Sequence, residues 1–558
     1  MAIIHELKIN NFRGIKTFSE ILDKNVICLV GRGDSGKTTI LEAISVVLSP
    51  NWNLSFYDSD FYNGNTDNAI EIEVSLIDIP EKLVREDKYG LYIRGLDNNG
   101  DIKDALEDDH KKLLTIKLEV KKDLEPQWHV VNSRHDPVRI SAPDRASLNV
   151  FMVADYIDRH FSWSRGNPLY SILKDNRKDS KDETDVIIEA LREAKVKIDQ
   201  DSFAQFNDVM EHIKIVSSNF GIDLSGAKTT IDFKDVSIKD GRVCLHDGNV
   251  PLRLKGKGTK RLISIAIQTV LAQNGGIMLI DEIEQGLEPD RVKHLVRSLK
   301  KGNSRQIILS THSSEVITEL ETNDLLIVSE NEGEIRVSAP DNNFQDIIRA
   351  CPEAGFAKKV IVCEGKTEIG ICRALDTQRH KDGKDYMATK SCVYLLGEGD
   401  NFTKRASKLK DLGLKVTVFC DADKDDKLSP SKDDLRNKDI GICECDKNNS
   451  IEHQVFCDLP WAGVLELLAY KEGELSEASI KDSVKCKYGK TLPPDWKVAD
   501  NNEIRKAIAE AATVKKKEWF KRIDHGEKLG AIILVHFDEM NGKKIKNQLE
   551  TLSKWIDI

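Results

Sequence analysis

The feature that most constrains this chain is a glycine-rich loop between a short apolar strand and a helix. Residues 31–38 read Gly-Arg-Gly-Asp-Ser-Gly-Lys-Thr, the G-x-x-x-x-G-K-[ST] pattern, and they directly follow a short buried strand expected at 25–30. From Thr38 onwards, apolar residues recur at helical spacing on one face. Glycines in such a loop let backbone N–H groups surround phosphate oxygens at a helix N-terminus. The pattern therefore predicts an α/β domain that binds nucleotide phosphates.

The polar residues of this loop have expected roles in binding the nucleotide and its metal ion. Lys37 is expected to reach the β- and γ-phosphates, and the Thr38 hydroxyl is expected to bind Mg²⁺. The candidate ATP-binding residues of the loop are Gly31, Gly33, Asp34, Ser35, Gly36, Lys37, Thr38 and Thr39.

Two later strands end in polar residues that complete such a site. The apolar run 277–280 ends in Asp281 and Glu282, which is the Walker B pattern. Asp281 is expected to hold Mg²⁺ through water, and Glu282 to orient or deprotonate the attacking water. The next strand, 306–310, leads to His312, which is placed to sense the γ-phosphate.

These three elements, in this order, resemble the ABC-type ATPase heads of the SMC and RecF group. In those heads a Ser-Gly-rich signature at a helix N-terminus caps the ATP that the opposite subunit holds. The matching stretch here, 255–259, departs from Leu-Ser-Gly-Gly-Gln but keeps Gly256 and Gly258 at the start of a helix. We identify no Q-loop glutamine. About 240 residues separate the two nucleotide motifs without sustained heptads, which excludes long coiled-coil arms.

The region between the nucleotide motifs combines strand and helix patterns. Residues 70–76 and 114–120 alternate with period two, which predicts half-buried antiparallel strands. Helical spacing from about 185 to 214 predicts two amphipathic helices. We expect an ABC-type ATPase domain over residues 1–345, with a helical segment inserted at about 155–225. That segment packs either on the domain's own core or on a partner subunit, as a dimerisation element.

A new alternation of strands and helices begins near residue 357. Strands are expected at 359–363, 392–396 and 415–420, with helices at 366–376 and 402–411 between them. This alternation predicts a parallel sheet. We expect residues 355–558 to form a second α/β domain with a helical extension at its C-terminal end.

Acidic residues follow two of these strands. Glu364 ends the first strand and Glu368 lies one helical turn later, while Asp421 and Asp423 end the third strand. The carboxyl ends of neighbouring parallel strands meet at one crevice, where four carboxylates repel one another unless cations lie between them. Hard oxygen ligands of this kind suit Mg²⁺ or Mn²⁺. The sequence therefore predicts a divalent-metal site at this edge.

This acidic pattern resembles the Toprim motif of topoisomerases, primases and OLD (overcoming lysogenization defect) nucleases. An ABC-type head followed by a Toprim domain is typical of the OLD family, which includes the Gabija nuclease subunit. We identify neither a tyrosine-nucleophile domain nor a primase-type zinc module, which favours the nuclease. By this resemblance the metal ligands are Glu364, Glu368, Asp421, Asp423 and Glu452, and the catalytic residues are Glu364, Asp421, Asp423 and a C-terminal lysine, Lys521 or Lys528.

The resemblance implies an ATP-regulated endonuclease that needs Mg²⁺ or Mn²⁺ and nicks or cleaves DNA in anti-phage defence. It also implies a homodimer or higher oligomer and a helicase-type or other defence partner protein. Two alternatives stay open. One is an ATP-gated DNA-binding sensor or clamp whose Toprim domain recruits a partner, and the other is an RNA or tRNA nuclease.

Composition limits where such a protein acts. The 11 cysteines include no C-x-x-C pair, the usage of a reducing cytosol, and no apolar run approaches the ~18 residues that span a bilayer. We therefore expect a cytoplasmic protein. The net charge of −10 does not indicate a nucleic-acid binder, but basic patches occur at 253–261 and 515–522. The spacing of Cys443, Cys445, His453 and Cys457 matches no common structural zinc site.

Overall fold

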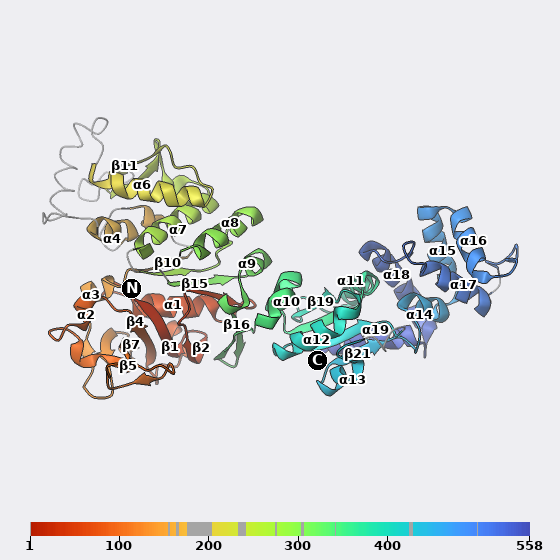
Figure 1. The fold of residues 1–558 in the computed structure, drawn as a ribbon, viewed down its shortest axis with the longest axis horizontal. Helices are drawn as coiled ribbons and strands as arrows, with labels where there is room; N and C mark the ends of the chain where they lie inside the picture. Colours follow the sequence, from red (N-terminus) through yellow and green to blue (C-terminus); the bar gives the residue numbers. More distant parts are fainter. Residues whose placement is uncertain are drawn as a thin grey trace. The chain divides into compact units, whose positions relative to one another are not determined.

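The strand before the glycine-rich loop, β3 (Val26–Val30), lies inside the largest sheet of this computed structural model. Figure 1 labels several other strands of this sheet. The chain forms two compact units, unit 1 (Met1–Gln345) and unit 2 (Asp346–Ile558), and each is described by itself. The structure describes residues 2–154, 157–162, 167–175, 204–232, 242–273, 276–302, 306–340, 342–422, 428–498 and 500–558.

Unit 1 is built around a mixed sheet that has 14 strands within the described residues. Its parallel part runs in the order β10 (Val150–Val153), β14 (Ile277–Ile280), β15 (Gln306–Thr311), β3 and β16 (Leu325–Asn331). The remaining strands, most of them antiparallel, are β17 (Glu334–Ser338), β2 (Ile15–Ile21), β1 (Ile3–Phe12), β4 (Ile70–Ile77), β7 (Lys111–Val120), β5 (Arg94–Leu96), β6 (Ile102–Lys103), β8 (Pro126–Val131) and β9 (Val138–Arg139).

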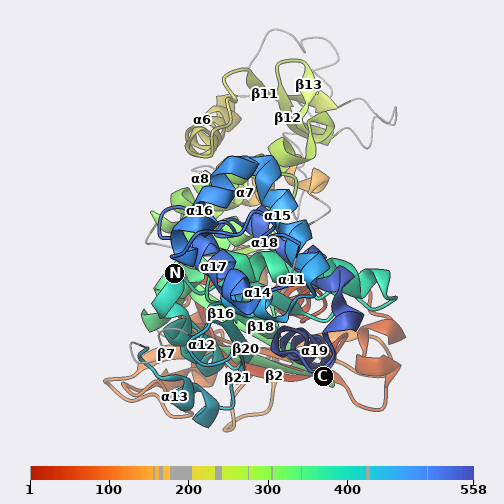
Figure 2. The ribbon, with the colours of Figure 1, turned by 90° about the vertical axis from the view of Figure 1, so that its right-hand side faces the viewer.

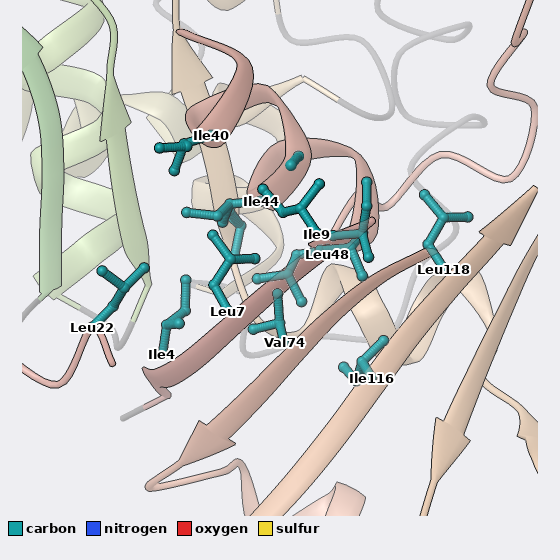
Figure 3. Close-up of a cluster of buried hydrophobic side chains, with 14 of the residues drawn as sticks. Ile4, Leu7, Ile9, Leu22, Ile40, Ile44, Leu48, Val74, Ile116 and Leu118 are labelled. Carbon is teal, nitrogen blue, oxygen red and sulfur yellow. The ribbon is translucent and has the colours of Figure 1, made fainter. Parts of the chain in front are cut away.

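Helix α1 (Lys37–Val47) packs its apolar face on the antiparallel part of this sheet (Figure 3). Ile40 and Ile44 of the helix are fully buried in one cluster with Leu7 of β1, Val74 of β4 and Leu118 of β7. Burial of such side chains contributes roughly 1.5–3 kcal/mol each. This packing fixes the helix, and with it the loop at its N-terminus.

The predicted strands at 70–76 and 114–120 are confirmed as β4 and β7, which pair antiparallel. Of the expected helical insertion, the structure describes α4 (Pro168–Asp175) and α6 (Ala204–Asn219), followed by a three-stranded sheet. The helix expected from about 185 lies outside the described residues. The strands of the smaller sheet are β11 (Ala227–Asp232), β12 (Arg242–Asp247) and β13 (Val250–Pro251).

Among the other helices of unit 1, α7 carries the apolar face that its sequence predicts. Leu262, Ile265, Ala266 and Val270 of α7 are all buried. These helices are α2 (Glu81–Val84), α3 (Ala142–Ala146), α7 (Lys257–Gln273), α8 (Pro289–Lys300) and α9 (Ser314–Glu319).

Unit 2 contains a parallel sheet in the order β19 (Cys392–Leu396), β18 (Lys359–Cys363), β20 (Lys415–Cys420), β21 (Gly441–Glu444). Figure 2 labels β18, β20 and β21 of this sheet. The three predicted strands are therefore confirmed, and β21 is a fourth that the sequence pattern did not predict. Helix α11 (Lys366–Lys381) continues past the predicted end at 376, and α12 (Phe402–Asp411) matches its predicted bounds.

Helices surround this sheet and extend beyond it. One buried cluster joins Ile361 of β18 with Phe456 of α14, Leu467 of α15 and Ile533 of α18. Among the described residues, no helix is both long and apolar enough to cross a bilayer. The other helices are α10 (Gln345–Ala350), α13 (Lys432–Asn437), α14 (Ile451–Asp458), α15 (Trp461–Leu475), α16 (Glu477–Tyr488), α17 (Asn502–Ala512), α18 (Ile523–Val535) and α19 (Lys544–Asp557).

Candidate functional site

The glycine-rich loop lies at the carboxyl end of β3, directly before α1. Gly36 adopts a left-handed backbone conformation (φ 91°), which glycine adopts most readily. At Gly31 a Cβ atom would collide with the carbonyl oxygen of Val328 on β16. These two glycines allow the tight turn under the helix N-terminus. Of the other predicted residues here, Gly33 and Asp34 are exposed, Ser35 is buried and Thr39 is half-buried.

Lys37 is a buried cation inside this loop. It is 4% exposed, and its ammonium group donates to the carbonyls of Gly31 (2.8 Å) and Arg32 (2.7 Å) and to the Ser35 hydroxyl (3.2 Å). Burial lowers the pKa of Lys37 to about 8, although nearby carboxylates oppose the shift. The ammonium group is thus held within the loop, where incoming phosphate oxygens would replace the loop acceptors.

The carboxyl ends of β14 and β15 bring polar groups to the same place as the loop. The Thr38 hydroxyl donates to the Asp281 carboxylate (3.0 and 3.2 Å), and the Ser310 hydroxyl donates to the same carboxylate (2.6 Å). Ser310 in turn accepts from the backbone N–H of Glu282 (2.8 Å). A hydroxyl and a carboxylate side by side are the ligands that a phosphate-binding loop offers to Mg²⁺, so these residues fit that ion.

Glu282 and a second glutamate occupy the segment after β14. Glu282 has a left-handed backbone conformation (φ 44°), uncommon for a residue with a side chain, and its carboxylate acts electrostatically on Lys37. Glu284 accepts hydrogen bonds from the Thr311 hydroxyl (2.7 Å) and the His312 backbone N–H (2.6 Å). Glu284 therefore positions the segment that carries the predicted sensor histidine. The only sequence signal for it is its place two residues after Glu282.

The predicted signature stretch begins α7 and packs beside the end of β14. A Cβ atom at Gly258 would collide with the carbonyl oxygen of Gly286, whereas Gly256 has open space around it. Arg261, one turn into the helix, donates to the Asp281 carbonyl and to Gln285. Gly258 and Arg261 thus tie the helix N-terminus to the nucleotide-binding strands, a connection that the sequence did not indicate.

In unit 2, the ends of β18 and β20 bring the predicted acidic residues together. Glu364 follows β18, and its Oε2 accepts from the backbone N–H of Asp421 (2.9 Å), which follows β20. Asp421 is 7% exposed, and its Oδ1 accepts from the Ile451 backbone N–H (2.6 Å) at the N-terminus of α14. A helix N-terminus favours negative charge, so α14 stabilises this carboxylate. Asp423 lies outside the described residues.

Two further carboxylates are buried beside this pair. Glu368 is 1% exposed; its Oε2 accepts from the Gly365 backbone N–H (2.9 Å), and its Oε1 is buried with no hydrogen-bond partner among the residues that the structure describes. Glu452 is also 1% exposed, and it accepts from the hydroxyls of Thr367 (3.3 Å) and Ser450 (3.1 Å). An unpartnered buried carboxylate oxygen costs free energy unless a proton or a cation meets it.

The charges of this cluster shift the acid strengths of its members. Burial raises the pKa of Glu368 to about 7, with Lys521 opposing the shift and Glu452 and Glu364 adding to it. Burial likewise raises the pKa of Asp421 to about 9, reinforced by Glu368 and Glu364. Both pKa values are raised mainly by burial and further by the neighbouring carboxylates, so added positive charge would lower them.

Of the two candidate lysines, the structure brings Lys521 to the carboxylates. A Cβ atom at Gly365 would lie 3.0 Å from Glu368 Oε2 and 3.8 Å from Lys521 Nζ. The surrounding carboxylates raise the pKa of Lys521, outweighing its partial burial. Both lysines have exposed side chains, but the described electrostatic contacts of Glu368 and Asp421 include Lys521 and not Lys528.

The donor set of this cluster suits a hard divalent cation. It offers four carboxylates, one of them with the unpartnered oxygen of Glu368, and no sulfur or imidazole ligand is needed. No three ligand oxygens of the described carboxylates in this cluster lie within 4.8 Å of one another. Among the described residues, three ligand atoms lie within 4.8 Å of one another only at Glu107, Asp109 and His110 of unit 1, where the two acidic residues are exposed.

Both units match known families. Residues 26–318, more than half of the chain, match the family described as "AAA domain, putative AbiEii toxin, Type IV TA system". Residues 356–423 match the family described as "Overcoming lysogenization defect protein-like, TOPRIM domain". An ATPase domain joined to a Toprim domain supports ATPase and nuclease-type activity in general and implies the use of ATP and a divalent metal. A search of curated proteins found no match.

Solved structures with a similar fold are ATPase heads. One is an Smc head domain with an extended coiled coil bound to the C-terminal domain of ScpA, from Pyrococcus furiosus (15% identity, TM-score 0.40, 62% of this chain and 98% of that chain). Another is an SMC head domain from Thermotoga maritima (15% identity, TM-score 0.30, 61% of this chain and 99% of that chain). A third is the recombination mediator protein RecF with ATPrS (14% identity, TM-score 0.36, 61% of this chain and 98% of that chain).

The two family matches identify the family of this chain. They agree with the nucleotide-binding strand ends in unit 1 and the carboxylate cluster in unit 2. The chain belongs to the AAA-domain family that covers more than half of its length, and its second domain is of the OLD-like Toprim type, which is the ATPase–Toprim architecture of the OLD family.

Proposed function

We propose that this protein is an ATP-regulated endonuclease that uses a divalent metal, Mg²⁺ or Mn²⁺, to nick or cleave DNA. The observation that carries the proposal is the unpartnered Oε1 of Glu368, buried among the carboxylates that a Toprim domain places at its strand ends. A structural cluster would satisfy this oxygen with a hydrogen bond, whereas a metal site leaves it open for the ion.

In this proposal the bound divalent ions would supply Lewis-acid activation of water and of the phosphodiester. Glu364, Glu368, Asp421 and Glu452 hold them, with Asp423 as a further ligand by its sequence position. Lys521 stabilises the negative charge that develops on the phosphate as the bond breaks, because its ammonium group already lies beside Glu368. The hydrogen bond from the Ile451 backbone N–H at the N-terminus of α14 fixes the Asp421 carboxylate, which would hold a divalent ion.

ATP bound by unit 1 regulates this cleavage. Lys37 and Thr38 bind the phosphates and their metal with Asp281, and Glu282 orients the attacking water. Gly256 and Gly258 cap the nucleotide of a second copy, so that ATP binding and self-association are linked. Because the ATPase and carboxylate sites belong to different compact units, hydrolysis gates access to DNA rather than driving bond cleavage.

The protein acts in the cytoplasm, as a homodimer or higher oligomer, in defence against phage and with a helicase-type or other defence partner. All eleven cysteines are free, which suits a reducing compartment.

A panel of nucleic acids tests the proposal. Supercoiled plasmid, linear duplex, single-stranded DNA and RNA are incubated with Mg²⁺, Mn²⁺ or a chelator, with and without ATP. We expect cleavage of DNA that requires metal, and a loss of about 10²–10³-fold in Lys521→Met, because one charge-stabilising group is removed. The matched variant Lys528→Met keeps the cleavage rate.

Three outcomes would change the assignment. Cleavage confined to RNA would make the protein an RNA nuclease with the same chemistry. Binding of DNA without any metal-dependent cleavage would instead favour an ATP-gated sensor or clamp. Equal losses in Lys521→Met and Lys528→Met would contradict the role given to Lys521.

A further inference from the structure

A buried lysine lies beside the carboxylate cluster of unit 2, on an element that carries none of the predicted metal ligands. Lys432 is the first residue of α13 and is 6% exposed. Its ammonium group donates to the backbone carbonyl of Asp421 (2.7 Å), and it forms an ion pair with Oε2 of Glu444, the last residue of β21 (3.0 Å). One cation therefore joins the end of β20, the start of α13 and the end of β21.

The ion pair does not by itself explain why a cation is buried at this position. Removing an ammonium group from water costs several kcal/mol, and the attraction of a buried partner often does not exceed that cost. Glu444 also accepts from the guanidinium group of Arg436 (2.5 Å), so its carboxylate has a second cation beside it. The bond to the Asp421 carbonyl is the contact of Lys432 that no other described residue duplicates.

Asp421 is held from three sides, and each of its polar groups is bonded to a different element. Its backbone N–H donates to Oε2 of Glu364 after β18 (2.9 Å), and its Oδ1 accepts from the backbone N–H of Ile451 at the start of α14 (2.6 Å). Its carbonyl accepts from Lys432 on α13. If that carbonyl loses its donor, the peptide group after Asp421 is no longer fixed, and the direction of the carboxylate is expected to change with it.

We propose that Lys432 is a positioning residue of the divalent-metal site, because it holds the Asp421 backbone and so keeps the Asp421 carboxylate in its place beside Glu364. The inference rests on the proposed function and deepens it by adding a residue that contacts neither the metal nor the substrate. Metal ligands must keep their positions to within about 0.5 Å, so a residue that fixes a ligand affects metal affinity. Loss of such a residue typically weakens metal binding by about 10–100-fold.

The test is Mn²⁺ binding to the full-length protein, measured without nucleotide or nucleic acid by electron paramagnetic resonance of the free ion. The binding that is lost in Glu364→Gln is assigned to the carboxylate cluster. For that binding, Lys432→Met is expected to raise the dissociation constant of Mn²⁺ by about 10–100-fold. Lys432→Gln, whose side chain is uncharged and shorter, is expected to raise it as well, and this variant supplies the measurement if the methionine variant does not fold.

Two matched controls separate positioning from the structural role of the ion pair. Glu444→Gln breaks the same pair but leaves the ammonium group of Lys432 at its carbonyl acceptor, so the melting temperature should fall while Mn²⁺ affinity stays at the wild-type value. Lys438→Met removes a lysine at the other end of α13, where it is bonded to Ser407 (2.8 Å) and Asp411 (3.0 Å), and should leave Mn²⁺ affinity unchanged. A purely structural role for Lys432 predicts instead that Lys432→Met and Glu444→Gln weaken Mn²⁺ binding equally.

The metal dependence of plasmid nicking gives a second measurement. Because Lys432 acts through metal affinity, Lys432→Met should need about 10–100-fold more Mn²⁺ for half-maximal nicking. Its rate at saturating Mn²⁺ should approach that of the wild type. A rate that stays low at every Mn²⁺ concentration would overturn the positioning role, because the defect would then lie in the chemical step or in the fold.

The outcomes distinguish this inference from the proposed function. Wild-type Mn²⁺ affinity in the folded Lys432 variants overturns the inference, as do equal losses in Lys432→Met and Glu444→Gln. If metal-dependent cleavage is found and the affinity is unchanged, only the inference fails. If the affinity falls as expected but no nucleic acid is cleaved under any condition, the positioning role stands and the nuclease assignment fails. If Glu364→Gln removes no Mn²⁺ binding, both fail.

Discussion

The buried carboxyl groups of Glu368 and Asp421 have raised pKa values, which make the stability of the metal-free protein depend on pH. Burial raises the pKa of Glu368 to about 7 and that of Asp421 to about 9, both above the ordinary values of 4.5 and 3.8. The folded protein without metal therefore holds protons that the unfolded chain releases. Stability from these groups is present at low pH and is lost as pH rises through the folded-state pKa values.

We predict that the metal-free protein loses stability between about pH 5 and pH 7, by about 1.4 kcal/mol per pH unit for each carboxyl that releases a proton on unfolding. Urea unfolding at several pH values in chelator measures it, and the difference between wild type and Glu368→Gln isolates the contribution of this residue. Mg²⁺ or Mn²⁺ should flatten the dependence. If Glu368→Gln has the same pH profile as wild type, the burial argument is wrong.

In the nucleotide site, the residue-scale prediction concerns hydrolysis. Glu282→Gln should slow ATP hydrolysis by about 10²–10⁴-fold while ATP binding persists, because the group that orients the water is lost and the phosphate contacts remain. Lys37→Ala should lose both binding and hydrolysis. Steady-state phosphate release and equilibrium nucleotide binding measure the two effects. Unchanged hydrolysis in Lys37→Ala would remove the phosphate role of this lysine.

The sequence alone identified those site residues whose position in the fold follows from the residues directly before and after them. Glu364 and Asp421 end apolar strands, so parallel pairing alone predicts that they meet. Lys521 could not be separated from Lys528, because the choice depends on how the segment before α18 folds back on α11. Glu284 and Arg261 escaped detection for the same reason, since their partners lie on other strands and helices.

At the scale of elements, the contact between α11 and α18 determines where Lys521 meets Glu368. A Cβ atom at Gly370 on α11 would collide with backbone atoms of Gly526 and Glu527 on α18, so the two helix backbones touch. Gly526 makes the reciprocal contact, since its Cβ would lie 2.6 Å from the carbonyl oxygen of Thr367. The close approach holds the start of α18 against the helix that carries Glu368.

We predict that Gly370→Ala destabilises the protein by about 1–3 kcal/mol, because rigid backbone cannot yield to the added methyl group. It should also reduce cleavage, since the helices separate and carry Lys521 away from the carboxylates. Denaturant unfolding and the plasmid assay measure the two effects.

The matched control is Gly473→Ala on α15, where nothing lies within 4 Å of the added Cβ. This exposed helical glycine should gain about 0.5–1 kcal/mol from the higher helix propensity of alanine. Equal behaviour of the two variants would contradict a specific contact between α11 and α18.

Strands and helices whose apolar residues form a clear pattern could be predicted from the sequence, whereas those without such a pattern could not. The runs that became β14, β15 and β18 are short, apolar and bounded by polar residues, so their bounds followed from composition. β21 has only Ile442 and Cys443 as apolar residues, too few for a strand pattern. The wide sheet of unit 1 depends on pairings between strands far apart in the chain, such as β3 with β15, which periodicity does not encode.

In the whole molecule, the residues for ATP hydrolysis and those for the proposed DNA cleavage belong to different compact units. The phosphate-binding loop and its metal ligands come from unit 1, and the carboxylates and Lys521 come from unit 2. We therefore predict that one activity can be removed without the other. Loss of the ATPase should alter the regulation of cleavage, while loss of the carboxylates should leave ATP hydrolysis intact.

The most direct measurement is plasmid nicking by Glu364→Gln, with ATP hydrolysis measured in the same preparation. Glutamine keeps an oxygen for the hydrogen bond from the Asp421 backbone, so the fold is preserved while the negative charge is lost. We predict that nicking of supercoiled plasmid in Mg²⁺ or Mn²⁺ disappears and that ATP hydrolysis is unchanged. Nicking at the wild-type rate would contradict the central claim that this carboxylate cluster is the nuclease site.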